Sequence, residues 1–134
     1  MKSNLNFTSD AKSWLEFADY DLKTARWEVE GEIYTSACYS CQQAAEKALK
    51  ALLLAKQGVI HKVHSLDFLI SKLKVFQIDT LFIEDEAREL DQYYITTRYP
   101  GQYGGPEGLY SEMDAKQAIA AAETILKFVK QQIF

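Results

Sequence analysis

One alanine-rich segment in the first half of the chain constrains the fold more than any other feature. Residues 39–52 read YSCQQAAEKALKAL. At about 100° per residue of helix, five alanines fall on one narrow arc. They are Ala37, Ala44, Ala48, Ala51 and Ala55. Because small side chains let a neighbouring helix approach closely, the segment predicts a long central helix that packs along this stripe.

The opposite side of the same helix is mixed in character. Its polar members are Gln42, Gln43, Glu46 and Lys50, and its apolar ones are Tyr39, Leu53 and Leu54. The polar residues are expected to form a solvated or interface face, with Glu46 and Lys50 spaced as an i, i+4 ion pair. The apolar ones suggest contact with a second subunit. Gln42, Glu46 and Lys50 are therefore candidate ligand-binding residues.

Length and charge limit the classes of function. The 134 residues suffice for one domain with a core, expected over residues 1–134. With 15 basic and 19 acidic residues, the net charge of −4 argues against an overall electrostatic grip on nucleic acid or membrane. It leaves a local basic site open. No apolar run is long enough to span a bilayer, and residues 1–10 lack the apolar core of a signal peptide. The chain is expected to be cytoplasmic, without a cofactor.

Two long helices are predicted before residue 60. The first is expected to begin at Ser9 or Asp10 as the N-cap and to end at residue 30, before Gly31. The second is the central helix, expected over residues 32–57. Gly58 follows it as the residue that terminates the helix in a left-handed conformation.

Three further helices complete the pattern. After a short connection over residues 59–64, Ser65 is the expected N-cap of a third helix. Asp79 or Thr80 is expected to cap a fourth, and Ser111 a fifth. No strand alternation or internal repeat interrupts them. The sequence therefore predicts an all-α fold, an antiparallel up-and-down bundle of about five helices.

Arg98 is the strongest candidate for a functional residue. The inner stripe expected for the fourth helix consists of Ile83, Ala87, Leu90 and Tyr94. One more turn of this stripe reaches Arg98, just before Pro100 prevents further regular helix. A guanidinium binds a phosphate or a carboxylate through two parallel hydrogen bonds. Asp21, on the inner stripe of the first helix, is its expected internal partner. Sequence leaves open whether this pair is only structural or also presents Arg98 to a ligand.

A glycine- and tyrosine-rich segment, residues 99–110, follows Arg98. Its backbone N–H groups could hold a phosphate, and Tyr99 or Tyr103 could stack on a base. The segment matches no phosphate-loop pattern, because no strand precedes it and no Gly-Lys-Ser/Thr follows. A plain surface connection is the alternative.

Cys38-x-x-Cys41 and His61-x-x-His64 together suggest zinc. However, the cysteines fall in the middle of a helix beside its apolar face, and the two pairs are farther apart than in a zinc finger. They are expected to be small core residues, and no metal is predicted. His64 precedes a helix start, where it caps the helix or reaches a cleft as an acid or base.

Four motifs in order resemble the HEPN domain family. They are ADYDLKTA at residues 18–25, QQAAEKALKA at residues 42–51, His64-Ser65-Leu66 and Thr97-Arg98-Tyr99-Pro100. The likeness covers roughly residues 14–129. It implies an up-and-down helical bundle that generally dimerises. It also implies a frequent pairing with a small nucleotidyltransferase in a toxin–antitoxin-like system.

The resemblance further implies metal-independent ribonuclease activity in many members, and nucleotide binding in others. The ribonucleases use an Arg-x(4–6)-His motif, with two copies meeting in the dimer cleft. This chain departs from that motif, because no histidine follows Arg98 and the fifth position after it holds Tyr103. An arginine alone mainly supplies phosphate binding and charge stabilisation, so enzymatic activity is left open.

The leading hypothesis is a homodimeric protein that binds a nucleotide or an RNA phosphate through Arg98 and pairs with a nucleotidyltransferase. Asp21 would orient Arg98, and Tyr99 or Tyr103 would stack on a base or receive a modification. One alternative is a ribonuclease that uses Arg98 with His64 or a tyrosine such as Tyr103. The other is a non-catalytic interaction module.

Overall fold

The computed structural model describes residues 4–101 and 104–134, with side chains from residue 10 onward. Its helices are α1 (Asn4–Glu30), α2 (Tyr34–Gln57), α3 (Leu66–Val75), α4 (Glu84–Asp91), α5 (Tyr93–Thr96) and α6 (Glu112–Ile133), with a 3₁₀ turn, η1 (Leu81–Ile83). No β-strand occurs in these described ranges. The prediction of an all-α bundle is confirmed.

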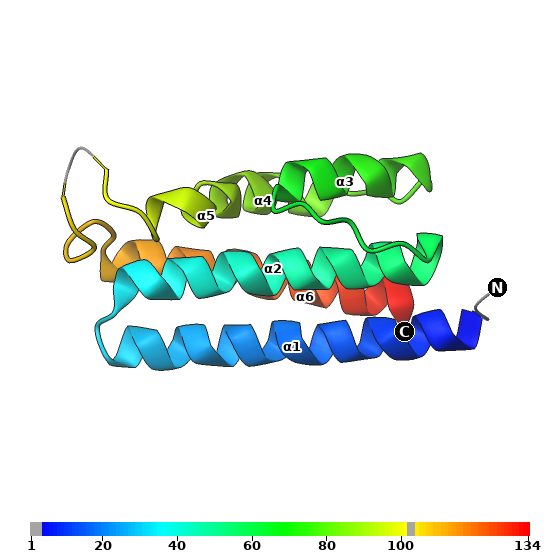
Figure 1. Ribbon diagram of the computed structural model, residues 1–134, viewed down its shortest axis with the longest axis horizontal. Coiled ribbons are helices and arrows are strands. Elements are labelled where there is room, and N and C mark those ends of the chain that lie inside the picture. The colour runs from blue at the N-terminus through cyan, green and yellow to red at the C-terminus, as the bar shows by residue number, and fades with distance from the viewer. Residues whose placement is uncertain (1–3, 102–103) are drawn as a thin grey trace.

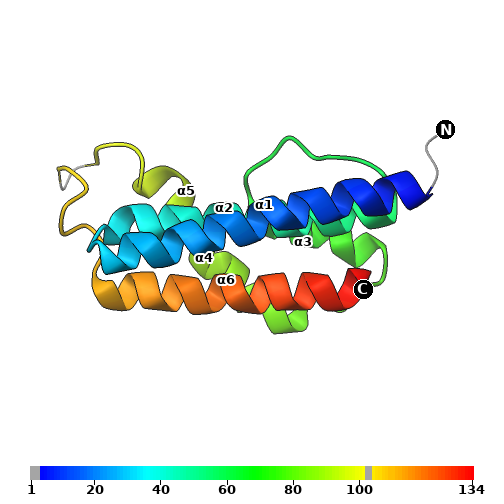
Figure 2. The same cartoon turned by 90° about the horizontal axis from the view of Figure 1, so that it is seen from below.

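Helix α2 is the central element. In Figure 1, α1 and α6 flank it on one side, and α3, α4 and α5 lie on the other. Figure 2 shows α1 and α6 as separate long rods against the same helix. The alanine stripe accounts for this position, because Ala37, Ala44, Ala48 and Ala51 are all fully buried. The prediction that neighbouring helices pack closely against this alanine stripe is therefore confirmed.

The segment between α2 and α3 runs back along α2 instead of turning directly into the next helix (Figure 1). The side chain of Gln42, just over four turns before the end of α2, donates a hydrogen bond to the backbone oxygen of His64 at 3.0 Å. About seven extended residues match the length of those four helical turns. As a result α2 and α3 point the same way, and the returning segment covers one side of α2.

Three predicted helix boundaries are confirmed, and each has a local chemical signal. Gly58 ends α2 with a φ of 74°, in the left-handed region. The Ser65 hydroxyl accepts a hydrogen bond from the Phe68 N–H at 3.1 Å and caps α3. Ser111 and Asp114 form a reciprocal capping box at the start of α6.

Three boundary predictions are wrong. Helix α1 begins at Asn4, so Ser9 and Asp10 lie inside it and are not caps. Helix α2 begins at Tyr34 and not at residue 32, because Glu32 has a φ of 62°. The expected fourth helix is divided into η1, α4 and α5. Arg98 follows the last of these pieces and is exposed, so it does not continue an inner stripe.

The two cysteines are core residues, as predicted. Cys38 and Cys41 are free thiols with no exposed surface. Burial raises the pKa of Cys38 to about 12 and raises the pKa of Cys41 further. Among the described residues, no three histidine, cysteine or acidic side chains are grouped so that they could hold a metal ion. None of the described helices is long and apolar enough to cross a membrane.

Candidate functional site

Arg98 lies just after the end of α5, at the start of the glycine- and tyrosine-rich segment. Its Nε–H donates to the backbone oxygen of Tyr94 at 2.8 Å, which fixes the direction of the side chain. Its guanidinium carbon lies 4.2 Å from the ring centroid of Tyr94, 5.1 Å from that of Tyr99 and 5.2 Å from that of Tyr39. Aromatic faces attract a guanidinium electrostatically without using its N–H groups. Within the described part of the chain the terminal nitrogens form no hydrogen bond, so they remain available to an anion.

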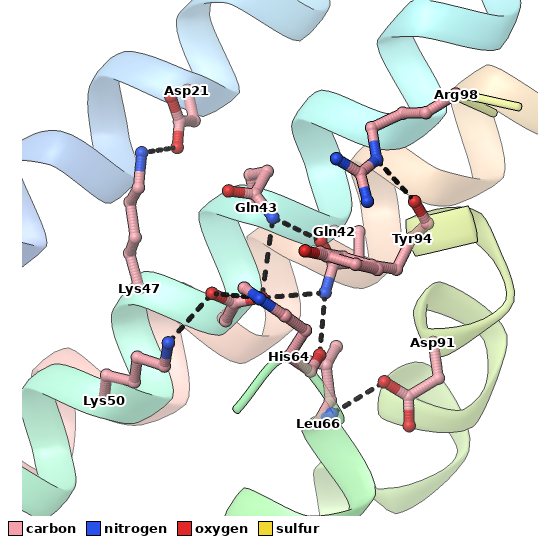
Figure 3. Close-up of polar contacts among 11 residues, drawn as sticks. Asp21, Gln42, Gln43, Lys47, Lys50, His64, Leu66, Asp91, Tyr94 and Arg98 are labelled. Carbon is pink, nitrogen blue, oxygen red and sulfur yellow. Dashed lines mark hydrogen bonds and ion pairs between the residues drawn. The ribbon is translucent and has the colours of Figure 1, made fainter. Parts of the chain in front are cut away.

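The expected pairing of Arg98 with Asp21 is wrong. Asp21 accepts a hydrogen bond from Lys47 Nζ at 2.6 Å, across the contact between α1 and α2. Figure 3 shows the Asp21–Lys47 pair apart from Arg98. Asp21 pairs with a lysine of the adjacent helix α2 and not with the arginine after α5. Within the described part of the chain, Arg98 forms no ion pair with a carboxylate. Asp21 accordingly does not orient it.

His64 joins the same cluster from the returning segment. Its ring stacks on Tyr94 with the centroids 4.1 Å apart and the planes 19° from parallel. In Figure 3 the Tyr94 ring lies between the His64 imidazole and the Arg98 guanidinium. The side chain of His64 is half exposed. The fold thus brings a histidine and an arginine to one aromatic ring, although the sequence places them on different segments.

The prediction that Gln42, Glu46 and Lys50 lie on a solvated or interface face is wrong, because these side chains are buried within the chain itself. The exposed fractions of these residues are 0%, 4% and 6%. They are buried because the segment over residues 58–65 covers this side of α2 (Figure 1). Leu53 and Leu54, which the sequence places on the same side of the helix, are also buried, with exposed fractions of 0% and 3%. None of these residues forms an open ligand-binding surface in this structure.

Glu46 is the centre of the buried polar cluster. Its Oε2 accepts a hydrogen bond from Lys50 Nζ at 3.0 Å, and its Oε1 accepts one from Gln42 Nε2 at 3.2 Å. His64 Nδ1 lies 3.2 Å from Oε1 and 3.3 Å from Oε2 (Figure 3). A buried carboxylate is tolerated only when it is paired and hydrogen-bonded in this way.

Several hollows lie beside Arg98 and Tyr94, and two of them include a candidate residue, Arg98 or His64, in their lining. The smaller, about 140 Å³, is lined by Arg98, Tyr99, Pro100 and Gly104 among others. The larger, about 650 Å³, includes His64, Tyr94 and Thr96 in its lining. Tyr99 is 58% exposed, so its ring is open to a ligand. Tyr103, a candidate from the sequence, lies outside the described residues.

A larger hollow, about 860 Å³, lies elsewhere, between α1 and α6. Four of its charged side chains are paired, since Arg26 contacts Glu123 at 2.9 Å and Lys130 contacts Asp19 at 2.8 Å. These pairs join the two helices across the groove. Lys127 also lines the groove and forms no ion pair within the described residues, but it has no aromatic ring as a partner there, in contrast to Arg98.

Sequence reasoning missed the central role of Tyr94. The expected stripe placed this tyrosine in the core, whereas the structure leaves it partly exposed as a platform between two functional candidates. Its spacing of four residues from Arg98 was a usable signal, because residues i and i+4 share a helix face. The contact between His64 and Glu46 had no comparable local signal.

Comparison with known proteins decides the family. Residues 11–132 match the HEPN domain model. The chain belongs to the HEPN family. The order of motifs in the sequence and the helical bundle of this HEPN protein agree with that assignment.

Curated and solved relatives of this HEPN protein span nearly its whole length. The "Putative toxin MJ1304" of Methanocaldococcus jannaschii is 28% identical over 135 residues, covering 90% of this chain and 86% of that protein. The crystal structure of TT1696 from Thermus thermophilus is 36% identical with a TM-score of 0.85, covering 91% of this chain and 97% of that one. The structure of ST0689, described as an archaeal HEPN homologue, is 37% identical with a TM-score of 0.77, covering 92% and 98%.

Proposed function

We propose that this HEPN protein binds a phosphate group of RNA or of a nucleotide through Arg98. The observation that carries the proposal is an exposed guanidinium held by one backbone hydrogen bond and three tyrosine rings. Its Nε–H is already used, so the two terminal nitrogens are the groups that face a phosphate. They match two phosphate oxygens with parallel hydrogen bonds. Because the side chain is held before binding, less conformational entropy is lost on association.

Tyr99 supplies the second part of the proposed ligand site. Its exposed ring lies beside the Arg98 guanidinium and lines the adjacent hollow. A base next to the bound phosphate stacks on this ring, as bases commonly do on exposed tyrosines in single-strand binding sites. Tyr103 keeps its proposed roles from the sequence alone, as a second stacking residue, a modified residue or a catalytic candidate.

We further propose a toxin-like role in the cytoplasm, in a pair with a nucleotidyltransferase. The support is the membership of the HEPN family and the similarity to a protein of Methanocaldococcus jannaschii named as a putative toxin. A nucleotidyltransferase gene next to the gene of this protein is the expected finding. A genome that carries no such gene nearby would count against the partner.

Titration of a fluorescently labelled single-stranded oligoribonucleotide tests the proposed phosphate site. Saturable binding is expected, with an affinity that falls as salt is added, because counterions compete for the phosphates. The same titration with a labelled nucleoside triphosphate separates a mononucleotide site from one that needs an RNA strand. Failure of both ligands to bind would contradict the proposed function.

The proposed assembly is a homodimer. The reason offered by Leu53 and Leu54 no longer applies, because both are buried. Helix α1 instead exposes Phe17, Tyr20 and Trp27 on one side, at 63%, 67% and 70%. These aromatic side chains are the proposed contact surface, since they expose more apolar area on one helix than a monomer needs.

Light scattering measures this assembly directly. A mass near twice 15.3 kDa is expected for the wild type. Trp27→Ser removes a large apolar contact and is expected to shift the mass towards the monomer. Phe82→Ser is the matched control, because Phe82 is at least as exposed as Trp27, at 76%, but lies on η1. A wild-type mass of 15.3 kDa would contradict the dimer.

A second candidate function is RNA cleavage without a metal ion. The observation that favours it is the Tyr94 ring with His64 on one side and Arg98 near it. His64 would take the proton of a ribose 2′-hydroxyl while the 2′-oxygen forms a bond to the adjacent phosphorus. The bond to the 5′-oxygen breaks, and that oxygen takes a proton from water. Arg98 would stabilise the charge that develops on the phosphate.

RNA cleavage in the presence of a chelator separates this candidate from simple binding. The wild type is expected to cleave, and His64→Ala is expected to lose about 10²–10⁴-fold in rate, the usual contribution of a general base. His61→Ala is the matched control, since His61 contacts Gln57 and is not among the residues that contact Tyr94 or Arg98. If the wild type binds RNA without cleaving it, the cleavage candidate is wrong. If it neither binds nor cleaves, a non-catalytic interaction module is the better description.

A further inference from the structure

Glu46 has more partners than a purely structural ion pair requires. Its carboxylate and the ammonium of Lys50 lie 3.0 Å apart, with side chains only 5% and 7% exposed. This pair already balances the buried charge. The carboxylate nevertheless reaches past Lys50 to the imidazole of His64, whose side chain is 52% exposed. Glu46 therefore connects the buried cluster to the surface at the site.

His64 is held from three directions. Glu46 contacts its Nδ1 at 3.2 Å, Gln42 donates to its backbone oxygen at 3.0 Å, and the Tyr94 ring covers one of its faces at 4.1 Å. Gln42 also donates to Glu46, which links the two contacts. Once Nδ1 is used, Nε2 is the remaining ring nitrogen.

The chemistry of these partners sets the proton on the ring. An ionised carboxylate only accepts hydrogen bonds, so a neutral imidazole must donate from the nitrogen that faces Glu46. The proton then lies on Nδ1, and Nε2 keeps its lone pair. A histidine in this tautomer accepts a proton at Nε2, whereas one in the opposite tautomer does not.

We propose that Glu46 is a positioning residue that holds neutral His64 in the tautomer protonated at Nδ1, with Nε2 ready to accept a proton from RNA bound at Arg98. The inference rests on the second candidate function, RNA cleavage, for its consequence and on the Glu46–His64 contact for its geometry. Glu46 itself is 4% exposed and does not touch the ligand. Asp21 was expected to orient Arg98; Glu46 instead orients His64.

Nitrogen-15 NMR of the imidazoles tests the tautomer independently of activity. The chain has two histidines, so the signals of His64 and His61 are readily separated. At a pH where both rings are neutral, the wild-type His64 is expected to carry its proton on Nδ1. Glu46→Gln removes the obligatory acceptor and is expected to shift His64 towards the Nε2-protonated tautomer, while the His61 signals stay unchanged. A wild-type His64 protonated at Nε2 would overturn the proposal.

Kinetics on the same variants test the consequence. Glu46→Gln is expected to lower kcat for RNA cleavage about 10-fold or more, with little change in KM, because Arg98 still binds the phosphate. Asp21→Asn is the matched control: it removes a carboxylate that pairs with Lys47 and should change neither the tautomer nor kcat. A Glu46→Gln variant with wild-type kcat would overturn the positioning role.

Two further arms keep the outcomes separate. If Glu46→Gln does not fold, Glu46→Gln combined with Lys50→Met removes both buried charges and allows the same tautomer measurement. If the wild type shows the Nδ1 tautomer but cleaves no RNA, the cleavage candidate fails while the assignment of Glu46 to the His64 tautomer is supported. The NMR and the kinetic results thus distinguish failure of this inference from failure of the function on which it rests.

Discussion

Replacing Arg98 with alanine is expected to weaken RNA binding about 10- to 100-fold without loss of helix content. Hydrogen bonds to a charged group contribute about 1.5–3 kcal/mol, and a phosphate held by the two terminal nitrogens of Arg98 loses them in this variant. The fold should be unaffected, because Arg98 is exposed and forms no ion pair with the described residues. Fluorescence anisotropy with labelled RNA gives the affinity, and circular dichroism gives the helix content.

Two control variants sharpen this result. Arg98→Lys keeps the positive charge but not the planar pair of donors, so an intermediate affinity is expected. Arg88→Ala removes an exposed arginine that pairs with Asp85 on α4, and no change in affinity is expected. Equal affinities of Arg98→Ala and the wild type would contradict the Arg98 site. Equal losses in Arg98→Ala and Arg88→Ala would indicate only a general dependence on positive charge.

Replacing Lys50 with methionine is expected to lower the free energy of unfolding by about 3 kcal/mol. Methionine keeps most of the length of the side chain but leaves the Glu46 carboxylate buried without its cation. Breaking a buried pair from one side costs about 3–5 kcal/mol, and Gln42 and His64 still donate to Glu46, so the lower end of that range applies. Urea unfolding measures the change, and a fall in Tm of about 10 °C should accompany it.

Lys47→Met is the matched control for this stability prediction. Lys47 lies one turn earlier on α2 and also pairs with a carboxylate, but its side chain and that of Asp21 are 26% and 20% exposed. Pairs with this access to water contribute less than about 1 kcal/mol, so a small change is expected. Equal losses in the Lys50 and Lys47 variants would show that burial does not separate the two pairs.

The elements of the fold that depend on local chemistry could be predicted from the sequence. Gly58, Ser65 and Ser111 mark helix boundaries through their own backbone or hydroxyl groups, and the structure confirms all three. The alanine stripe predicted the central position of α2, because it depends only on the helical repeat and on side-chain size. Arg98 could be selected as a candidate because it stands where a helical pattern meets a proline.

The partners within the site could not be predicted, because they depend on the path of a coil segment. Helical periodicity describes a surface but not what covers it. The burial of Glu46 and Lys50 follows from residues 58–65 returning along α2, and no pattern in those residues fixes that direction. The predicted partner of Asp21 was wrong for a related reason. Whether Asp21 pairs with Lys47 or with Arg98 depends on how α1 packs against α2, which helical periodicity does not describe.

Two side chains that contact Tyr94, those of His64 and Arg98, lie far apart in the sequence, and the return of the chain along α2 brings His64 to this ring. His64 lies just before α3 and Arg98 just after α5, so the whole α3–α5 hairpin lies between them. Their meeting depends on where that hairpin begins and ends, and not on how long it is. Insertions or deletions inside the hairpin would change the spacing of the two residues and preserve the contact of each with Tyr94. A search for arginine and histidine at a fixed short interval would overlook every protein that brings them together in this manner.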